Sequence, residues 1–327
     1  MDFSSIKDFL KEDLDKVNKL MESSLSTDIE LLDKTNRAIL SHNGKQVRPV
    51  LALLVARACS GGFTTDDTIK YAAAVELLHN ATLLHDDVAD DSPVRRGVPT
   101  VMSILGGRAS VLLGDYWLVK GMENILASRN SSDKVIRIFA STLTDLAEGE
   151  LLQLQKAETG DTLEKDYYRI IYDKTASLFV ASAAAGAISV SATEEKMSAA
   201  RTYAKCLGVA FQIRDDIFDY EENVEIGKPV GLDLKEKKIT LPLLGALAKA
   251  GEERGREIRR KLCRIDDHPE YGSEIIEFVK SEGGIEYARK RLYEYVDNAR
   301  IALRPFGNLQ EVEMLCEIAE FTADRKS

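Results

Sequence analysis

Cysteine and basic charge are both scarce in this chain. Its 327 residues include four cysteines, no two of which have CxxC spacing, so we expect reduced thiols and neither a disulfide framework nor a zinc site. Acidic residues outnumber basic ones, 54 to 44, and the formal net charge of −10 argues against a nucleic-acid-binding protein. Anionic small molecules are not excluded, because a few local lysines and arginines suffice to make a positive pocket.

Targeting and membrane-spanning segments are not evident either. The N-terminus, "MDFSSIKDFLKEDLDKV", is charged throughout and has no apolar signal core. The uncharged stretch "TASLFVASAAAGAISVSAT", residues 175–193, is rich in alanine, serine and glycine, which favour close packing between helices. We interpret it as a buried helix and expect a soluble, cytoplasmic protein without a transmembrane segment.

Proline is missing between Pro99 and Pro229, and the alternation typical of strands is scarce there. Helical spacing recurs instead, for example at Leu146, Leu151 and Leu154. No linker rich in proline, glycine or serine divides the chain. We therefore predict an all-α protein with one domain over residues 1–327 and roughly a dozen helices.

Two acidic motifs share the spacing DDxxD. "DDVAD" begins at Asp86 and "DDIFD" begins at Asp215, each at the C-terminal end of an apolar helical run. Residues four apart lie on nearly one face of a helix, so the first and last aspartates of each motif align. Polar residues continue below the motifs, at His79, Thr82 and Gln212. The candidate metal ligands are Asp86, Asp87, Asp90, Asp215, Asp216 and Asp219.

A lone DDxxD in an acidic protein is more often a solvated helix end than a metal site. If two copies face each other, however, each like-charged pair at ~6 Å costs about 3 kcal/mol at an effective dielectric near 20. Bound cations would remove that cost, and hard divalent ions match oxygen ligands, Mg²⁺ above all. His85 could ligate a softer metal, but no second histidine or cysteine has ligand spacing, which disfavours zinc.

Basic residues near the motifs suit phosphate. Two arginines follow the first motif around Gly97, and the arginine fork matches diphosphate oxygens. "HNGKQVRP" places a lysine and an arginine at the expected start of a helix, a favourable anion position, although the P-loop spacing is absent. Singly each lysine is more often a surface residue; together they indicate a pocket for two diphosphates. The candidates are Lys45, Arg48, Arg95, Arg96, Lys174, Lys228 and Lys238.

Several stretches together carry a family resemblance. They are "GKQVRP", "VELLHNATLLHDDVADDSPVRRG", "ASVLLGD", "EGELLQL", "DKTASL", "GVAFQIRDDIFDY" and "GKPVGLDLKEKKITLPLL". The chain resembles the trans-isoprenyl diphosphate synthases essentially from end to end. The resemblance implies an all-α isoprenoid synthase fold around a central cavity and a homodimer. It also implies prenyl transfer from an allylic diphosphate, with farnesyl diphosphate expected as starter, to isopentenyl diphosphate.

The same resemblance assigns residues. The six aspartates would bind three Mg²⁺ ions around the allylic diphosphate, and no side chain is implied as general base. Contacts to that diphosphate would come from Arg95, Lys174, Thr175, Gln212, Lys228 and Lys238. The isopentenyl diphosphate site would comprise Lys45, Arg48, His79 and Arg96. The residues expected to act in catalysis are Asp86, Asp87, Asp90, Arg95, Lys174, Asp215, Asp216 and Lys238.

Arg214 departs from the family pattern, which usually has an apolar residue directly before the second motif. We expect its side chain to point away from the metals.

Product length would be set one helical turn below the first motif. Ala81 and Thr82 stand there, where short-chain members often carry an aromatic ring, so the sequence resembles the long-chain, octaprenyl-type synthases. Met122, Ile125 and Leu126 are candidates for the floor of the product tunnel, although helical spacing makes a plain core role equally good. The expected product is a long all-trans polyprenyl diphosphate for a quinone side chain.

Five other interpretations stay open. A short-chain farnesyl or geranylgeranyl synthase differs only in product length. A cyclase commonly replaces the second DDxxD, and squalene-type synthases lack "GKQVRP" and "RRG". A non-catalytic subunit of a heteromeric prenyltransferase should have lost aspartates or arginines that all stand here. A helical scaffold with solvent-facing acidic clusters is the remaining alternative.

Overall fold

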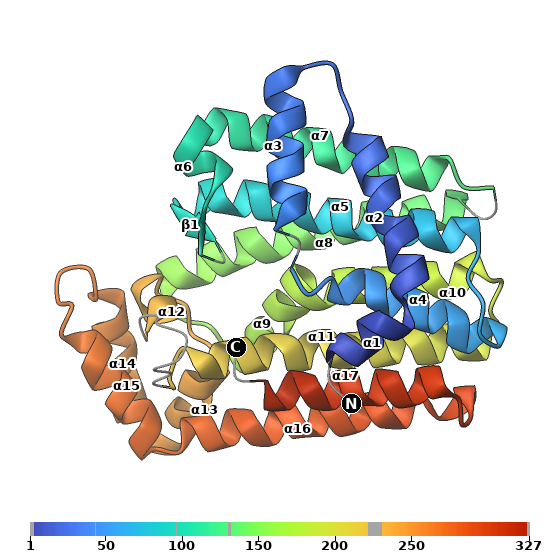
Figure 1. Cartoon of the computed structure of the whole chain (residues 1–327). Helices are drawn as coiled ribbons and strands as arrows, with labels where there is room; N and C mark the ends of the chain where they lie inside the picture. Colours follow the sequence, from blue (N-terminus) through green and yellow to red (C-terminus); the bar gives the residue numbers. More distant parts are fainter. Residues whose placement is uncertain (1–2, 43, 96, 130–131, 222–230, 326–327) are drawn as a thin grey trace. The chain divides into compact units, whose positions relative to one another are not determined.

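The structure is a computed structural model that describes residues 3–42, 44–95, 97–129, 132–221 and 231–325. Regular structure in these ranges is helical apart from one short hairpin, so the all-α prediction is confirmed (Figure 1). In chain order the elements are α1 (Phe3–Phe9), α2 (Lys11–Leu25), α3 (Glu30–Ser41), α4 (Val47–Ser60), α5 (Asp66–Ala89), β1 (Val94–Arg95), β2 (Val98–Pro99), α6 (Val101–Leu105), α7 (Gly107–Leu126), α8 (Ser132–Thr159), α9 (Glu164–Ile171), the π-helical turn η1 (Tyr172–Ala176), α10 (Ser177–Ser189), α11 (Glu194–Phe218), α12 (Leu232–Lys235), α13 (Leu241–Ala250), α14 (Glu252–Cys263), α15 (Tyr271–Ser281), α16 (Gly284–Ala302), the 3₁₀ turn η2 (Arg304–Phe306) and α17 (Gln310–Asp324).

The chain divides into two compact units. Unit 1 comprises Met1–Ala140, Ala181–Arg201 and Pro305–Leu315, and unit 2 comprises Ser141–Val180, Thr202–Arg304 and Cys316–Ser327. The first acidic motif belongs to unit 1 and the second to unit 2. The single domain expected over residues 1–327 stays a prediction.

Helix α5 has the most extensive packing in unit 1. It packs on α2, α4 and α7, and most of its residues from Asp67 to Leu84 are buried. A helix covered on all sides needs apolar side chains on all sides, which "YAAAVELL" supplies. Helix α7 comes especially close, since a Cβ added at Gly121 would lie 2.2 Å from Cδ1 of Leu78. This packing fixes the helix axis that ends in the first motif.

The alanine-rich stretch forms a closely packed helix, as expected. Helix α10 buries most of its alanines, and Gly186 lies directly against α4. A Cβ added at Gly186 would stand 2.3 Å from the backbone oxygen of Ala52, so no larger residue fits without movement. None of the helices described here is both long enough and apolar enough to cross a membrane.

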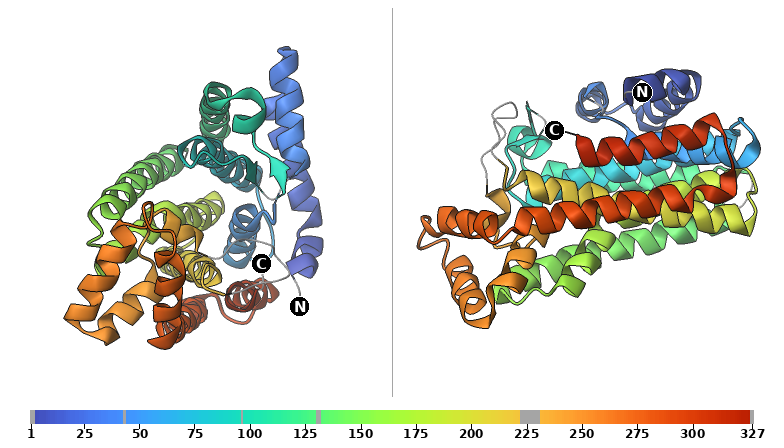
Figure 2. Two further views of the ribbon diagram at one scale, coloured as in Figure 1. Left: turned by 90° about the vertical axis from the view of Figure 1, so that its left-hand side faces the viewer. Right: turned by 90° about the horizontal axis from the view of Figure 1, so that it is seen from below.

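In unit 2, α13 packs on α16. Gly284 permits it, because a Cβ there would lie 2.1 Å from the backbone oxygen of Pro242. The end of α17 lies antiparallel beside α16 (Figure 2): the Tyr293 hydroxyl donates to Asp324 at 3.1 Å and Arg300 pairs with Glu320 at 3.2 Å. These contacts bring the C-terminal residues back toward the middle of unit 2.

Candidate active site

The first motif lies where α5 emerges from its packing. His79, Thr82 and Asp86 follow one another at helical intervals and are half-buried, whereas Ala81 and Asp87 are buried. Helix α5 ends at Ala89. The polar face predicted below the first motif therefore exists, and it is the face of α5 that the packing leaves partly open.

Asp87 is held by an arginine from the segment after the motif. That segment is a small antiparallel hairpin, in which Arg95 pairs with Val98, and Gly97 has a φ of 78°. The turn needs the left-handed backbone that glycine adopts readily. Arg95 Nε donates to Asp87 Oδ1 at 2.6 Å, so the arginine predicted to contact diphosphate is positioned by the buried second aspartate of the motif.

The "GKQVRP" stretch starts a helix, as predicted. Helix α4 begins at Val47, directly after Gln46, which has a left-handed φ of 55° and donates from its side chain to Asn18 at 2.8 Å. Lys45 is exposed and Arg48 is half-buried in the first turn, where helix amides favour anions. The sequence-predicted basic pair thus stands at a helix N-terminus in unit 1.

The chain-length candidates differ in burial. Ala81 is 1% exposed and Ile125 is fully buried, whereas Met122 is half-buried and Leu126 is exposed. The Thr82 hydroxyl donates to the backbone oxygen of His79 at 2.8 Å. An enlarged side chain at Ala81 would therefore have to displace packed neighbours.

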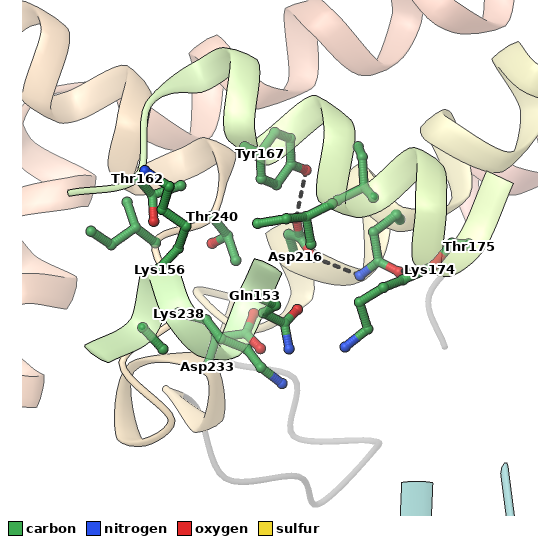
Figure 3. A pocket seen from close by; sticks show the side chains of 15 residues that line it. Gln153, Lys156, Thr162, Tyr167, Lys174, Thr175, Asp216, Asp233, Lys238 and Thr240 are labelled. Atoms are coloured by element: carbon green, nitrogen blue, oxygen red, sulfur yellow. Dashed lines mark hydrogen bonds between the residues drawn. The ribbon is translucent and has the colours of Figure 1, made fainter. Parts of the chain in front are cut away.

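The second motif borders a pocket of about 130 Å³ in unit 2 (Figure 3). The pocket brings together five residues singled out by the sequence, from three separate segments of the chain. They are Lys174, Thr175, Gln212, Asp216 and Lys238. Asp215 lies one residue away on α11, half-buried.

Lys174 and Thr175 are presented by the π-helical turn η1, a widened helical turn that is frequent at functional sites. Two glycines let neighbouring helices close around this turn. A Cβ at Gly149 of α8 would lie 2.7 Å from Asp173 Cβ, and one at Gly208 of α11 would lie 2.6 Å from Ala176 Cα. Helices α8 and α11 therefore pack closely on two sides of η1, which fixes the backbone position of Lys174.

Asp216 is the most enclosed carboxylate of the site, with 3% of its surface exposed. Tyr167 donates to one oxygen at 2.6 Å and Gln212 donates to the other at 2.8 Å, while Thr175 donates to Gln212 at 2.8 Å (Figure 3). Burial raises the pKa of Asp216 to about 7; the two hydrogen bonds oppose the rise and the charge of Asp215 adds to it.

Asp219, the last aspartate of the second motif, is bonded by backbone amides. Its carboxylate accepts from the backbone amides of Leu232 at 2.9 Å and Asp233 at 3.1 Å, and its carbonyl accepts from Gly231 at 2.9 Å. It thereby satisfies amides at the start of α12. Burial raises its pKa, and these backbone hydrogen bonds oppose the rise.

The Arg214 side chain bonds groups other than the aspartates of the motif. Its guanidinium donates to the backbone oxygen of Arg325 at 3.1 and 2.9 Å, pairs with Glu221 at 3.3 Å and lies 4.2 Å from the centre of the Phe218 ring.

Tyr167 and Asp233 also line the pocket and were not predicted from the sequence. Tyr167 stands seven residues before Lys174, two helical turns away, a spacing that could have identified it. Asp233 lies in the quoted "GLDLKEKK" stretch five residues before Lys238, and burial raises its pKa well above its ordinary value, with the charges of Asp216 and Asp219 adding to the rise. Arg96 and Lys228, both predicted to contact diphosphate, lie outside the described residues.

Metal ions fit some of these carboxylates better than others. Within the described ranges, no three His, Cys, Asp or Glu side chains are gathered closely enough to hold an ion. Asp87 and Asp216 are buried and accept hydrogen bonds from side chains of the protein. Asp86, Asp90 and Asp215 keep solvent exposure, and carboxylate oxygens of this kind suit Mg²⁺.

Known proteins are similar to this chain in sequence and fold over its whole length. Residues 29–279 match the polyprenyl synthetase family. The octaprenyl diphosphate synthase of Escherichia coli (strain K12) is 35% identical over 326 residues, 99% of each chain. A solved decaprenyl diphosphate synthase from Rhodobacter capsulatus is 33% identical with a TM-score of 0.91 over 100% of both chains. A polyprenyl synthase from Caulobacter crescentus CB15, solved with calcium and isoprenyl diphosphate, is 34% identical with a TM-score of 0.90 over 100% of this chain and 98% of the other.

The chain belongs to the polyprenyl synthetase family. It is accordingly a prenyltransferase, a trans-prenyl diphosphate synthase, and the expected isoprenoid synthase fold is confirmed. The family is metal-dependent. Names of its relatives span products from geranylgeranyl to decaprenyl diphosphate.

Proposed function

We propose that this enzyme adds isopentenyl diphosphate repeatedly, head to tail, to an allylic diphosphate such as farnesyl diphosphate, and makes a long-chain all-trans polyprenyl diphosphate. The observation that carries the proposal is the pocket in unit 2. It gathers Lys174, Thr175, Gln212 and Lys238, which the family resemblance assigns to the allylic diphosphate, beside Asp216, one of the expected metal ligands. Random surface residues would not converge in this way.

The proposed metal site holds three Mg²⁺ ions, and fewer than the six aspartates bind these ions directly. Asp86, Asp90 and Asp215 would hold the ions directly, because these carboxylates keep solvent exposure. When bound, Mg²⁺ would stabilise the charge that develops on the departing diphosphate. Asp87 and Asp216 would act as positioning residues, since both are buried and each accepts a hydrogen bond from a side chain of the protein.

The cationic residues would bind two different diphosphates. Lys174 and Lys238 would bind the allylic diphosphate beside Asp216, together with Thr175 and Gln212. Their positive charge favours the departure of a trianionic leaving group. For isopentenyl diphosphate, the proposed contacts are the helix-start pair of α4 and a half-buried histidine on α5. These residues are Lys45, Arg48 and His79.

Turnover tests the function directly. The purified protein with Mg²⁺, isopentenyl diphosphate and farnesyl diphosphate should release inorganic diphosphate and give linear products longer than the starter by whole isoprene units. Reversed-phase chromatography then separates the alternatives. Products of eight or so units would support the long-chain proposal, and accumulation at four units would favour a geranylgeranyl synthase. Cyclic hydrocarbons would contradict both.

Chain length gives one prediction. Replacing Ala81 by phenylalanine should shorten the product, because a ring one turn below the first motif would block the path of the growing tail. The measurement is the chromatographic product profile, with Ala81→Val as a milder control. An unchanged profile in a folded Ala81→Phe variant would rule out the gate.

We also propose a homodimer. Helix α7 exposes three large apolar side chains at intervals of seven residues, Leu112, Val119 and Leu126. Residues seven apart share one helix face, and an apolar stripe of this length is typical of a surface that another chain covers. Light scattering on the purified protein should give twice the mass of one chain.

A further inference from the structure

Arg325 fastens the C-terminal end of α17 to the second acidic motif. Its Nη2 donates to Asp215 Oδ1 at 2.7 Å and to the backbone oxygen of Phe211 at 3.0 Å, and its guanidinium lies 3.9 Å from the centre of the Phe211 ring. Only 8% of the Arg325 side chain is exposed, against 41% of Asp215. A cation so deeply covered differs from the loose ion pairs of protein surfaces.

Arg214 holds the backbone of the same residue. Two of its nitrogen atoms donate to the Arg325 carbonyl, and a third pairs with Glu221. The aromatic ring of Phe218 lies under the Arg214 guanidinium and within 5.6 Å of the Arg325 guanidinium. Arg214 therefore fixes the main chain at position 325, and the side chain of Arg325 bonds Asp215 from that fixed backbone position.

We propose that Arg325 is an internal cation that competes with a divalent metal ion for Asp215, and that Arg214 is the clamp that keeps it there. The inference rests on the proposed function, in which Asp215 is a metal ligand. A guanidinium and a metal ion would draw on lone pairs of one carboxylate, and their positive charges repel each other. Metal binding must then loosen the C-terminal residues, and removing Arg325 must strengthen metal binding, since such coupling is reciprocal.

The clamp explains why an arginine stands at position 214. In the family resemblance this position is usually apolar, and an apolar side chain could not bond the carbonyl of Arg325. The competing contact should therefore be weaker when Arg214 is replaced by isoleucine, although Arg325 itself is retained. Replacing Arg325 and replacing Arg214 should both strengthen metal binding, and replacing Arg325 should have the larger effect.

Direct metal binding provides the test. Mn²⁺ binding to the full-length protein would be measured by electron paramagnetic resonance in the presence of inorganic diphosphate. Arg325→Gln should tighten Mn²⁺ binding about tenfold, the order expected for losing one charge-assisted hydrogen bond. Arg214→Ile should tighten it about threefold by the same coupling. Arg300→Gln is the matched control: it removes one positive charge from α16 in the same unit, where Arg300 pairs with Glu320, and should change nothing.

A second readout uses the unmodified protein. Carboxypeptidase should remove residues up to Arg325 slowly from the protein alone and several times faster once Mn²⁺ and diphosphate are bound. This measurement decides the proposal if either variant fails to fold. Unchanged or weaker Mn²⁺ binding in folded Arg325→Gln, or equal trimming with and without metal, would overturn it. Loss of turnover and metal binding in the wild type would instead overturn the proposed function.

Discussion

The two acidic motifs have the same spacing and different surroundings. The first ends α5 in the open, with Asp90 exposed and one side chain of the protein, Arg95, bonded to its second aspartate. The second is enclosed: Asp216 accepts two hydrogen bonds, and Asp219 accepts two backbone amides. Position within the motif, more than the motif itself, therefore decides whether a carboxylate faces solvent or supports a neighbour.

One rule holds in both motifs. The second aspartate is buried and bonded to a side-chain donor, and the first is half-buried. On a helix the two differ by about a quarter-turn, so packing that covers one leaves the other at the edge. The comparison predicts large effects at the first aspartates, smaller ones at the second, and the smallest at the donors that hold them.

Loss of a first aspartate should have the largest effect. Asp86→Asn and Asp215→Asn should each lower kcat about a thousandfold, because each removes a proposed metal ligand. Steady-state turnover at saturating Mg²⁺ is the measurement. Asp91→Asn is the control: Asp91 is exposed directly after the first motif and has a φ of 47°, which asparagine tolerates. A kcat within tenfold of wild type for either first-position variant would contradict the rule.

The second aspartates should matter less and act through partners. Asp87→Asn and Asp216→Asn should lower kcat/KM about ten- to a hundredfold, the range typical of residues that orient ligands. For Asp87 the effect should fall mainly on KM for the allylic diphosphate, because Arg95 loses its anchor. Arg95→Lys should reproduce most of it. If Asp216→Asn lowers turnover as much as Asp215→Asn does, the first and second aspartates have the same role and the rule is contradicted.

The donor to Asp216 should give the smallest effect. Tyr167→Phe removes one hydrogen bond and should raise the Mg²⁺ concentration needed for half-maximal activity about three- to tenfold, as expected for one bond to a charged group. Tyr168→Phe removes a hydroxyl one residue away, where no hydrogen bond to the motif is formed, and should leave that concentration unchanged. Equal shifts in both variants would assign the effect to general packing.

Much of unit 2's pocket was predictable because its residues sit in local patterns. Lys174, Thr175 and Gln212 follow helical spacing around recognisable motifs, and the structure brings them together. Tyr167 was missed because a tyrosine in an amphipathic helix resembles a core residue. The contact of Arg325 with Asp215 could not be predicted, since the two residues are 110 positions apart and no local pattern encodes such a contact.

The hydrogen-bond donors to the carboxylates could not be predicted from the sequence either. Six carboxylates were expected to need cations, yet the protein's own donors already bond several of them. Arg95 and Tyr167 come from segments before or after the helices that carry the motifs, so their role depends on tertiary packing. The hairpin that carries Arg95 was not predicted from the sequence, and its turn depends on the left-handed backbone of Gly97.

Anomalous diffraction from crystals grown with Mn²⁺ and a non-hydrolysable allylic thiodiphosphate tests the central claim most directly. The account predicts Mn²⁺ peaks bonded to oxygens of Asp86 and Asp215, with both sets of ions on one and the same diphosphate. It predicts no peak within bonding distance of Asp87 or Asp216. Ions on the second aspartates, or ions at the two motifs that share no diphosphate, would contradict it.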